Sequence, residues 1–173
     1  MSLGTFSFGP YTATYSPNTN AAGSGAGAVD LGLVEGVRRL RRAPAAKMLQ
    51  SDYYGPGTDI EGIFQGGNCF LSMVFKEWKA INKYAIWPYA TDIGAVGQVG
   101  RQLTDLAGIL VLTAVNGTLA ASNGPVTITA NLAIIAPNTD VEILLGTDAR
   151  DIPVTFQLLP YNASGTVRWF SVT

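Results

Sequence analysis

The chain has 173 residues, a formal net charge of −1 and only 13% charged side chains, about half the share in a typical soluble domain. It contains no histidine and one cysteine, Cys69. These absences exclude every Ser-His-Asp or Cys-His arrangement, a conventional zinc site and an internal disulfide. The composition therefore predicts one domain over residues 1–173 that is not an enzyme and holds no metal ion or cofactor.

The low charge also predicts contact with other molecules, because a lone monomer of this composition would expose much apolar or neutral surface. Residues 106–139 carry no charge, but Asn116-Gly117 and residues 123–125 interrupt them. No apolar run reaches the roughly 20 residues that a bilayer requires, and we expect no membrane partner. The chain opens without a basic region and apolar run, so we expect no signal peptide. The expected partner is more copies of the same chain.

The first 50 residues predict an extended start and one hairpin. Residues 6–15 are aromatic and β-branched, typical of an extended arm or an edge strand, and Pro10 favours an edge. Residues 16–28 contain no large apolar side chain, so residues 1–28 are expected to form an N-terminal arm and a Gly/Ala-rich loop. Residues 29–50 contain alternating apolar positions interrupted by Pro44, and we expect a long hairpin within them.

The middle of the chain predicts short strands and a helix. Turn-forming residues at 52–59 and the sequence Gly66-Gly67-Asn68 bracket a short strand at 60–65. A second strand is expected at 69–79. Helical spacing of apolar residues predicts a short helix near 78–87, ended by Pro88.

The last third predicts four strands, at 108–115, 126–135, 152–159 and 167–172. The first is a continuous apolar run and is expected to be buried on both faces. Together the segments predict a mainly β fold of two packed antiparallel sheets, as a sandwich or barrel. One short helix and long loops would flank the sheets.

The positive charges are concentrated in one segment. Five of the eleven are Arg38, Arg39, Arg41, Arg42 and Lys47, so the remainder of the chain carries six positive and twelve negative charges, a net of −6. This asymmetry suits head-to-tail contact between copies, and it also suits an anionic ligand such as nucleic acid. We interpret the basic segment as a contact between subunits or between rings of subunits.

Two carboxylates stand close together at Asp59 and Glu61. On a strand, residues two apart lie on the same face. A glycosidase pair normally flanks a cleft from separate strands, so catalysis is not the preferred interpretation. We expect instead an acidic face that lines a pore.

The closing third also resembles a known family. The resemblance rests on Gly108-Ile-Leu-Val-Leu-Thr, Gly124-Pro-Val-Thr-Ile-Thr-Ala, Arg150-Asp-Ile-Pro-Val-Thr-Phe-Gln-Leu-Leu-Pro-Tyr161 and Trp169-Phe-Ser-Val-Thr173, with Thr58-Asp-Ile-Glu-Gly-Ile-Phe-Gln-Gly-Gly in the middle of the chain. These segments resemble the major tail tube proteins of long-tailed bacteriophages.

The resemblance implies two packed β-sheets with a flanking helix, six copies in each ring, and rings stacked into a hollow tube. Double-stranded DNA would pass through the tube without specific binding. The implied location is the virion tail, assembled in the host cytoplasm, and the implied partners are sheath, terminator, tape measure and baseplate proteins. The family has no catalytic residues to carry over. Two alternatives stay open: another tail component of similar fold, such as a terminator or hub-proximal ring protein, and a capsid-decorating β-sandwich protein.

Overall fold

The structure, a computed structural model, describes eleven parts of the chain. They are residues 11–17, 27–32, 34–50, 53, 59–76, 85–89, 96–97, 99–114, 127–137, 139–141 and 151–173. Within them the protein is mainly β, with antiparallel sheets and a short helix, which confirms the predicted fold class.

The strands differ greatly in length. They are β1 (Tyr11–Ser16), β2 (Val29–Asp30), β3 (Val34–Gln50), β4 (Asp59–Phe75), β5 (Gly108–Ala114), β6 (Thr127–Ile135), β7 (Ile152–Leu158), β8 (Tyr161–Ala163), β9 (Thr166–Arg168) and β10 (Ser171–Val172). The helix α2 spans Leu103–Leu106.

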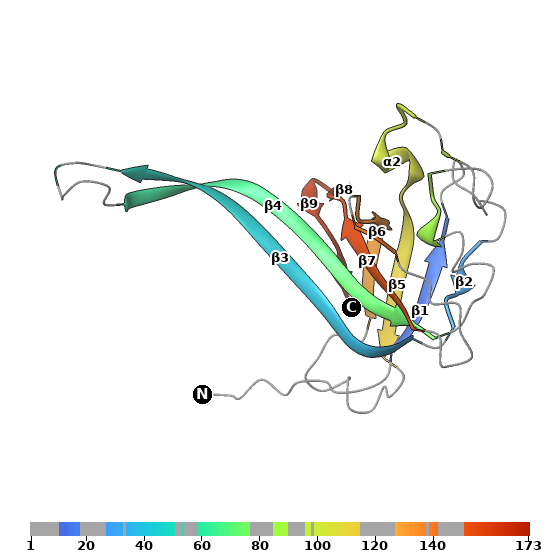
Figure 1. Cartoon of the computed structure of the whole chain (residues 1–173). Coiled ribbons are helices and arrows are strands. Elements are labelled where there is room, and N and C mark those ends of the chain that lie inside the picture. The colour runs from blue at the N-terminus through green and yellow to red at the C-terminus, as the bar shows by residue number, and fades with distance from the viewer. Residues whose placement is uncertain are drawn as a thin grey trace, which may run out of the picture.

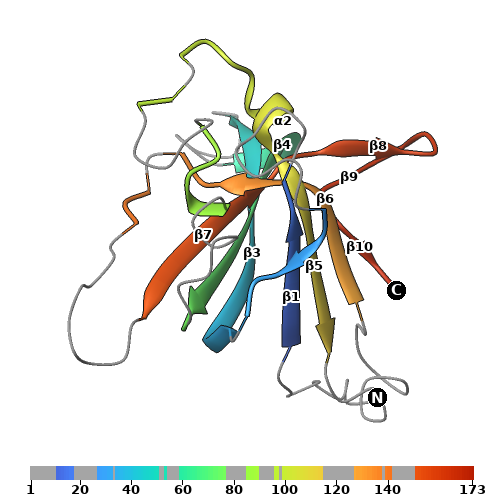
Figure 2. The same cartoon turned by 90° about the vertical axis from the view of Figure 1, so that its right-hand side faces the viewer.

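One eight-stranded antiparallel sheet forms the body of the molecule (Figure 1). Its order is β2-β1-β5-β6-β7-β4-β3, and β10 also pairs with β6. Only the last residues of β6 pair with β7, while its first residues pair with β10. The two strands therefore share the edge of β6 that lies opposite β5, and they diverge from one another (Figure 2). The short strands β8 and β9 form a separate hairpin beside this sheet.

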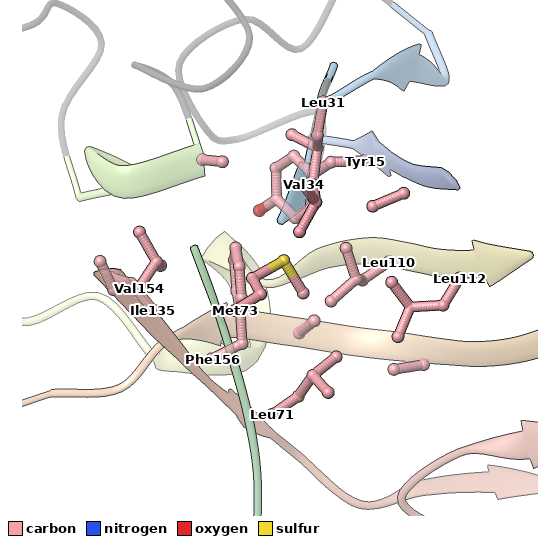
Figure 3. Close-up of a cluster of buried hydrophobic side chains, with 14 of the residues drawn as sticks. Tyr15, Leu31, Val34, Leu71, Met73, Leu110, Leu112, Ile135, Val154 and Phe156 are labelled. Carbon is pink, nitrogen blue, oxygen red and sulfur yellow. The ribbon is translucent and has the colours of Figure 1, made fainter. Parts of the chain in front are cut away.

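Most of the core lies on one face of the curled sheet, and a separate smaller cluster of Leu106, Ala107 and Ile134 lies at α2. Alternate residues point inward on β4, from Cys69 to Phe75, and on β7, from Ile152 to Leu158. Figure 3 shows Tyr15, Leu31 and Val34 facing the side chains of β4, β5 and β7 across this core. The curling therefore produces a sandwich-like packing from a single continuous sheet.

Phe156 occupies the centre of the core and is completely buried. Its ring centroid lies 6.0 Å from that of Tyr15 and 6.4 Å from that of Phe75, the latter in an edge-to-face arrangement. Aromatic pairs at these separations add to the stabilisation from burial. The three rings connect β1, β4 and β7 across the sheet.

The Tyr15 hydroxyl is buried close to the backbone of Gly108 and has no hydrogen-bond partner among the described residues. Burial raises the pKa of this hydroxyl far above its ordinary value of 10.0. Unfolding would return the pKa to that ordinary value. The folded state therefore loses stability as the pH rises above about 10, where the unfolded chain can ionise.

We expect Tyr15→Phe to keep the fold and to reduce this alkaline loss of stability. The ring remains, and the unsatisfied hydroxyl, which costs about 1–3 kcal/mol when buried, is removed. Thermal unfolding of both proteins at about pH 8 and about pH 11 measures the effect, because the other tyrosines are common to both. An equal loss of stability in the two proteins between these pH values would contradict the prediction.

Several strand predictions are confirmed, and four need correction. The strand predicted at 167–172 is divided into β9 and β10, which pair with different strands. Strands at 108–114, 127–135 and 152–158 match their predicted positions, but Ile109 is 43% exposed, so the first is not buried on both faces. The hairpin predicted within 29–50 is wrong, because one continuous strand, β3, fills most of that range. The turn predicted at Gly66-Gly67-Asn68 is also wrong, because β4 continues through it.

Two further predictions, the N-terminal arm and the helix near 78–87, agree with the structure in part. β1 lies inside the sheet, between β2 and β5, and buries Ala13 and Tyr15, so it is neither a free arm nor an edge strand along its whole length. Within the helix predicted near 78–87, Ala85 and Ile86 are helical, and residues 77–84 lie outside the described part. No helix in the part of the chain that the structure describes is long and apolar enough to cross a membrane.

Candidate assembly interface

A two-stranded ribbon projects from the body of the protein (Figure 1). β4 pairs with β7 only from Cys69 onward, whereas β3 and β4 continue to pair with each other as far as Gln50 and Asp59. We call residues 42–50 and 59–68 the ribbon. Ten residues of β4 at about 3.3 Å each give it a length of roughly 33 Å.

The ribbon contributes nothing to the core. None of its described side chains is buried; the first buried residue of β4 is Cys69, where the pairing with β7 begins. A two-stranded hairpin is marginally stable by itself in water. The described part of the ribbon therefore gains no stabilisation from the core of its own chain.

The ribbon also carries exposed hydrophobic side chains. Ile63 is 52% exposed and Phe64 is 56% exposed, and Met48 and Leu49 are exposed on the strand beside them. Tyr53, between the two strands, is 88% exposed. Large apolar side chains gathered on one projection mark an interaction surface, because single exposed residues scattered elsewhere are ordinary.

The base of the ribbon has an interrupted backbone. Pro44 stands opposite Gly67, and the register shifts between Ala45 and the next residue of β3, which leaves Gln65 as an extra residue in β4. Gly66 has a φ of 106°, which favours glycine, and a Cβ on Gly67 would lie 2.4 Å from the Ala43 carbonyl oxygen. These features form a β-bulge, which bends and twists the strands at this level.

The Arg42 side chain connects the ribbon to the C-terminal part of the chain. Its guanidinium carbon lies 5.3 Å from the centre of the Phe64 ring and 5.1 Å from that of Trp169. A cation over an aromatic face is worth roughly 0.5–1 kcal/mol at an exposed site. An open cleft lies beside this cluster, between Phe64–Gly67 of β4 and the segment Val167–Trp169. The contacts of Arg42 hold the inner face of the ribbon against Trp169.

Arg39 and Arg41 lie on the opposite face from Arg42. They stand opposite Ser72 and Phe70, which alternate with the buried residues of β4 and so face away from the core. A shallow groove on this outer face, which we call the basic groove, is lined by Arg39, Arg41, Phe70, Ser72, Thr139 and Thr155. Within the described residues the only ion pair is Lys76 with Asp151, so neither arginine forms an ion pair with a described carboxylate; Asp140 lies next to the groove residue Thr139.

The remaining predicted site residues are distributed along the ribbon. Lys47, Asp59 and Glu61 all lie near its tip, far from the basic groove along the strands. The Arg38 side chain lies outside the described part of the structure. The basic segment is therefore split, with Arg39 and Arg41 on one face at the base, Arg42 on the other face, and Lys47 at the tip.

Asp59 and Glu61 do not share a face, contrary to the prediction. Asp59 stands opposite Gln50 and Glu61 stands opposite Leu49, which are consecutive residues of β3. A register shift between them makes Ile60 an extra residue, and this bulge cancels the two-residue alternation. Asp59 accepts a hydrogen bond of 3.1 Å from the Gln50 side-chain amide. The two carboxylates thus give the tip negative charge on both faces.

The single cysteine does not contribute chemistry to this region. Cys69 is buried where β4 joins the sheet, and its burial raises the pKa of the thiol, which keeps it protonated and unreactive. The described residues contain no group of three or more potential metal-ligating acidic or cysteine side chains. The exposed chemistry of this region is hydrophobic contact, charge and open strand edges.

Sequence reasoning missed the hydrophobic part of this surface. It identified the charged residues but treated Ile63 and Phe64 as part of a short strand ended by a turn. Continuous β-pairing through Pro44 and Gly67, which the sequence signals disfavour, places Met48 and Phe64 on one face of the ribbon and Leu49 and Ile63 on the other. The adjacent apolar pairs 48–49 and 63–64 were the available signal.

Comparison with known proteins gives no assignment. The sequence matches no protein-family profile, and no curated protein is significantly similar to it.

Proposed function

We propose that this chain is a structural subunit that assembles with copies of itself through the ribbon, as the wall of a tube. The single observation that carries the proposal is the ribbon itself: a long projection with no share in the core and with exposed hydrophobic side chains. The resemblance to bacteriophage tail tube proteins gives the form of assembly, which is rings of six copies stacked into a hollow tube that conducts DNA. The proposal includes no catalytic activity.

The size of the ribbon suits such a contact. Two strands are about 10 Å wide, so each face of a ribbon roughly 33 Å long covers roughly 300 Å². Both faces together with the edges approach the about 800 Å² that each partner contributes to a stable interface. Among the described strands, neither β3 nor the first part of β4 has a second neighbour along the ribbon. Such open edges pair readily with another chain.

Negative-stain electron microscopy of the purified protein tests this function. We expect hollow tubes or stacked rings, and we expect the assembled fraction in sedimentation to rise with protein concentration. A protein that stays monomeric at high concentration would overturn the proposal. Closed single rings or trimers that never stack would instead favour a terminator or a capsid-decorating protein.

A further inference from the structure

The ribbon is electrically polar along its length. It begins at Arg42, directly after Arg39 and Arg41 of the same strand, and no acidic residue stands on the paired segment of β4 beside these three arginines. Its tip carries Asp59 and Glu61 against one positive charge, Lys47. The base is therefore positive and the tip is negative.

The two ends of one ribbon are too far apart to neutralise each other. Leu49, which stands opposite Glu61, is eight positions along β3 from Arg41, and this corresponds to roughly 26 Å. The Debye length at physiological ionic strength is about 8 Å, so solvent ions screen the two ends from one another. Any neutralisation of the basic groove by the tip must therefore come from a different copy.

The groove and the tip also match in shape and polarity. The groove is open: Phe70 stands opposite Arg41, and Ser72 stands opposite Arg39 with its hydroxyl 3.0 Å from that of Thr155. The tip is narrow, and it presents Ile63 and Leu49 beside Glu61. A tip that lies in the groove would place the Glu61 carboxylate near the guanidinium groups of the groove. It would also place the apolar side chains of the tip against Phe70.

We propose that the ribbon tip of one copy docks into the basic groove at the ribbon base of a second copy. This inference rests on the proposed self-assembly and gives it a direction. The two surfaces in the contact are different, so the contact is head-to-tail: it generates a ring if the rotation closes and a continuing helical stack if it does not. Each added copy presents a new vacant tip or groove to the next.

Two charge-reversed variants test the docking. One is Arg39→Glu with Arg41→Glu, which makes both ends of the ribbon acidic; the other is Asp59→Lys with Glu61→Lys, which makes both ends basic. All four side chains are exposed, so the variants are expected to fold, as circular dichroism can verify. Each variant alone should lose the assembled fraction, because its tip and groove repel each other.

A mixture of the two variants should recover assembly, with the two proteins in equal amounts. Every acidic groove then meets a basic tip, and every basic groove meets an acidic tip. Sedimentation followed by quantification of each variant in the pellet measures this, and negative-stain microscopy shows the form of the product. Assembly of the wild-type protein should also weaken as salt rises to about 1 M, where the Debye length falls to about 3 Å.

The outcomes separate this inference from the proposed function. If the wild type assembles but the mixture of variants does not co-assemble, the docking is overturned and the proposed function stands. The same conclusion follows if each variant assembles alone as well as the wild type does. A wild-type protein that stays monomeric would overturn both. A third result would also overturn the docking. If unassembled wild-type protein binds a labelled DNA duplex and the Arg39→Glu/Arg41→Glu variant does not, the groove is a nucleic-acid site.

Discussion

Replacement of residues 46–65 by Asn-Gly is expected to abolish assembly and to leave the body of the protein folded. Ala45 and Gly66 stand directly opposite each other, so a two-residue turn can join them. The replaced segment contains no buried side chain among its described residues. The core and the pairing of β4 with β7 are untouched, and the exposed hydrophobic side chains of the ribbon are removed.

Two measurements establish this result together. Sedimentation should find the shortened protein as a monomer at concentrations where the wild type assembles, and thermal unfolding should differ by no more than a few degrees, because surface changes usually alter stability by less than about 0.5 kcal/mol each. A matched control is Val96→Ser with Val99→Ser, since both valines are almost completely exposed but lie outside the ribbon. Tubes formed by the shortened protein would remove the ribbon from the interface.

Phe156→Ala is expected to give the largest loss of stability of a single substitution. The side chain is completely buried and contacts both Tyr15 and Phe75. Removing a phenylalanine from such a site costs about 3–5 kcal/mol, from lost burial and from the cavity that remains. For a chain of this size the midpoint of thermal unfolding should fall by roughly 10 °C.

Phe64→Ala provides the control for the same chemical change at an exposed position. Phe64 lies on the ribbon and contacts Arg42, so we expect it to cost less than about 1 kcal/mol. Assembly should be more sensitive to Phe64→Ala than to Phe156→Ala. Phe64→Ala should weaken assembly of the folded protein, whereas Phe156→Ala should reduce assembly only under conditions in which the protein unfolds. Equal losses of thermal stability would mean that Phe156 is not at the centre of the core.

The sequence predicted the strands whose signals are local. Residues 152–158 alternate clearly, and residues 108–114 form a short apolar run, so β7 and β5 were found close to their true bounds. The ribbon was not found, because Pro44 and Gly66-Gly67 are ordinarily chain breakers. Here they stand opposite each other, where a bulge absorbs both irregularities and both strands continue.

The candidate site was predicted in part for a similar reason. The basic and acidic residues are visible as a charge pattern, but the separation of Arg39 and Arg41 from Arg42 depends on which residues face the core. The placement of Asp59 and Glu61 on opposite faces depends on the extra residue Ile60. Trp169, more than a hundred residues from Arg42 in sequence, became its neighbour only through the folding of the sheet.

The bulge at the base of the ribbon has a mechanical consequence for any polymer of this chain. The ribbon joins the body through two strands, and both are interrupted at the same level by Pro44 and by Gly66-Gly67. Bending stiffness falls where a strand pair is narrow and its hydrogen-bond ladder is broken. A wall built from such units would concentrate its deformation at these joints, so that it could curve while the body of each unit stayed rigid.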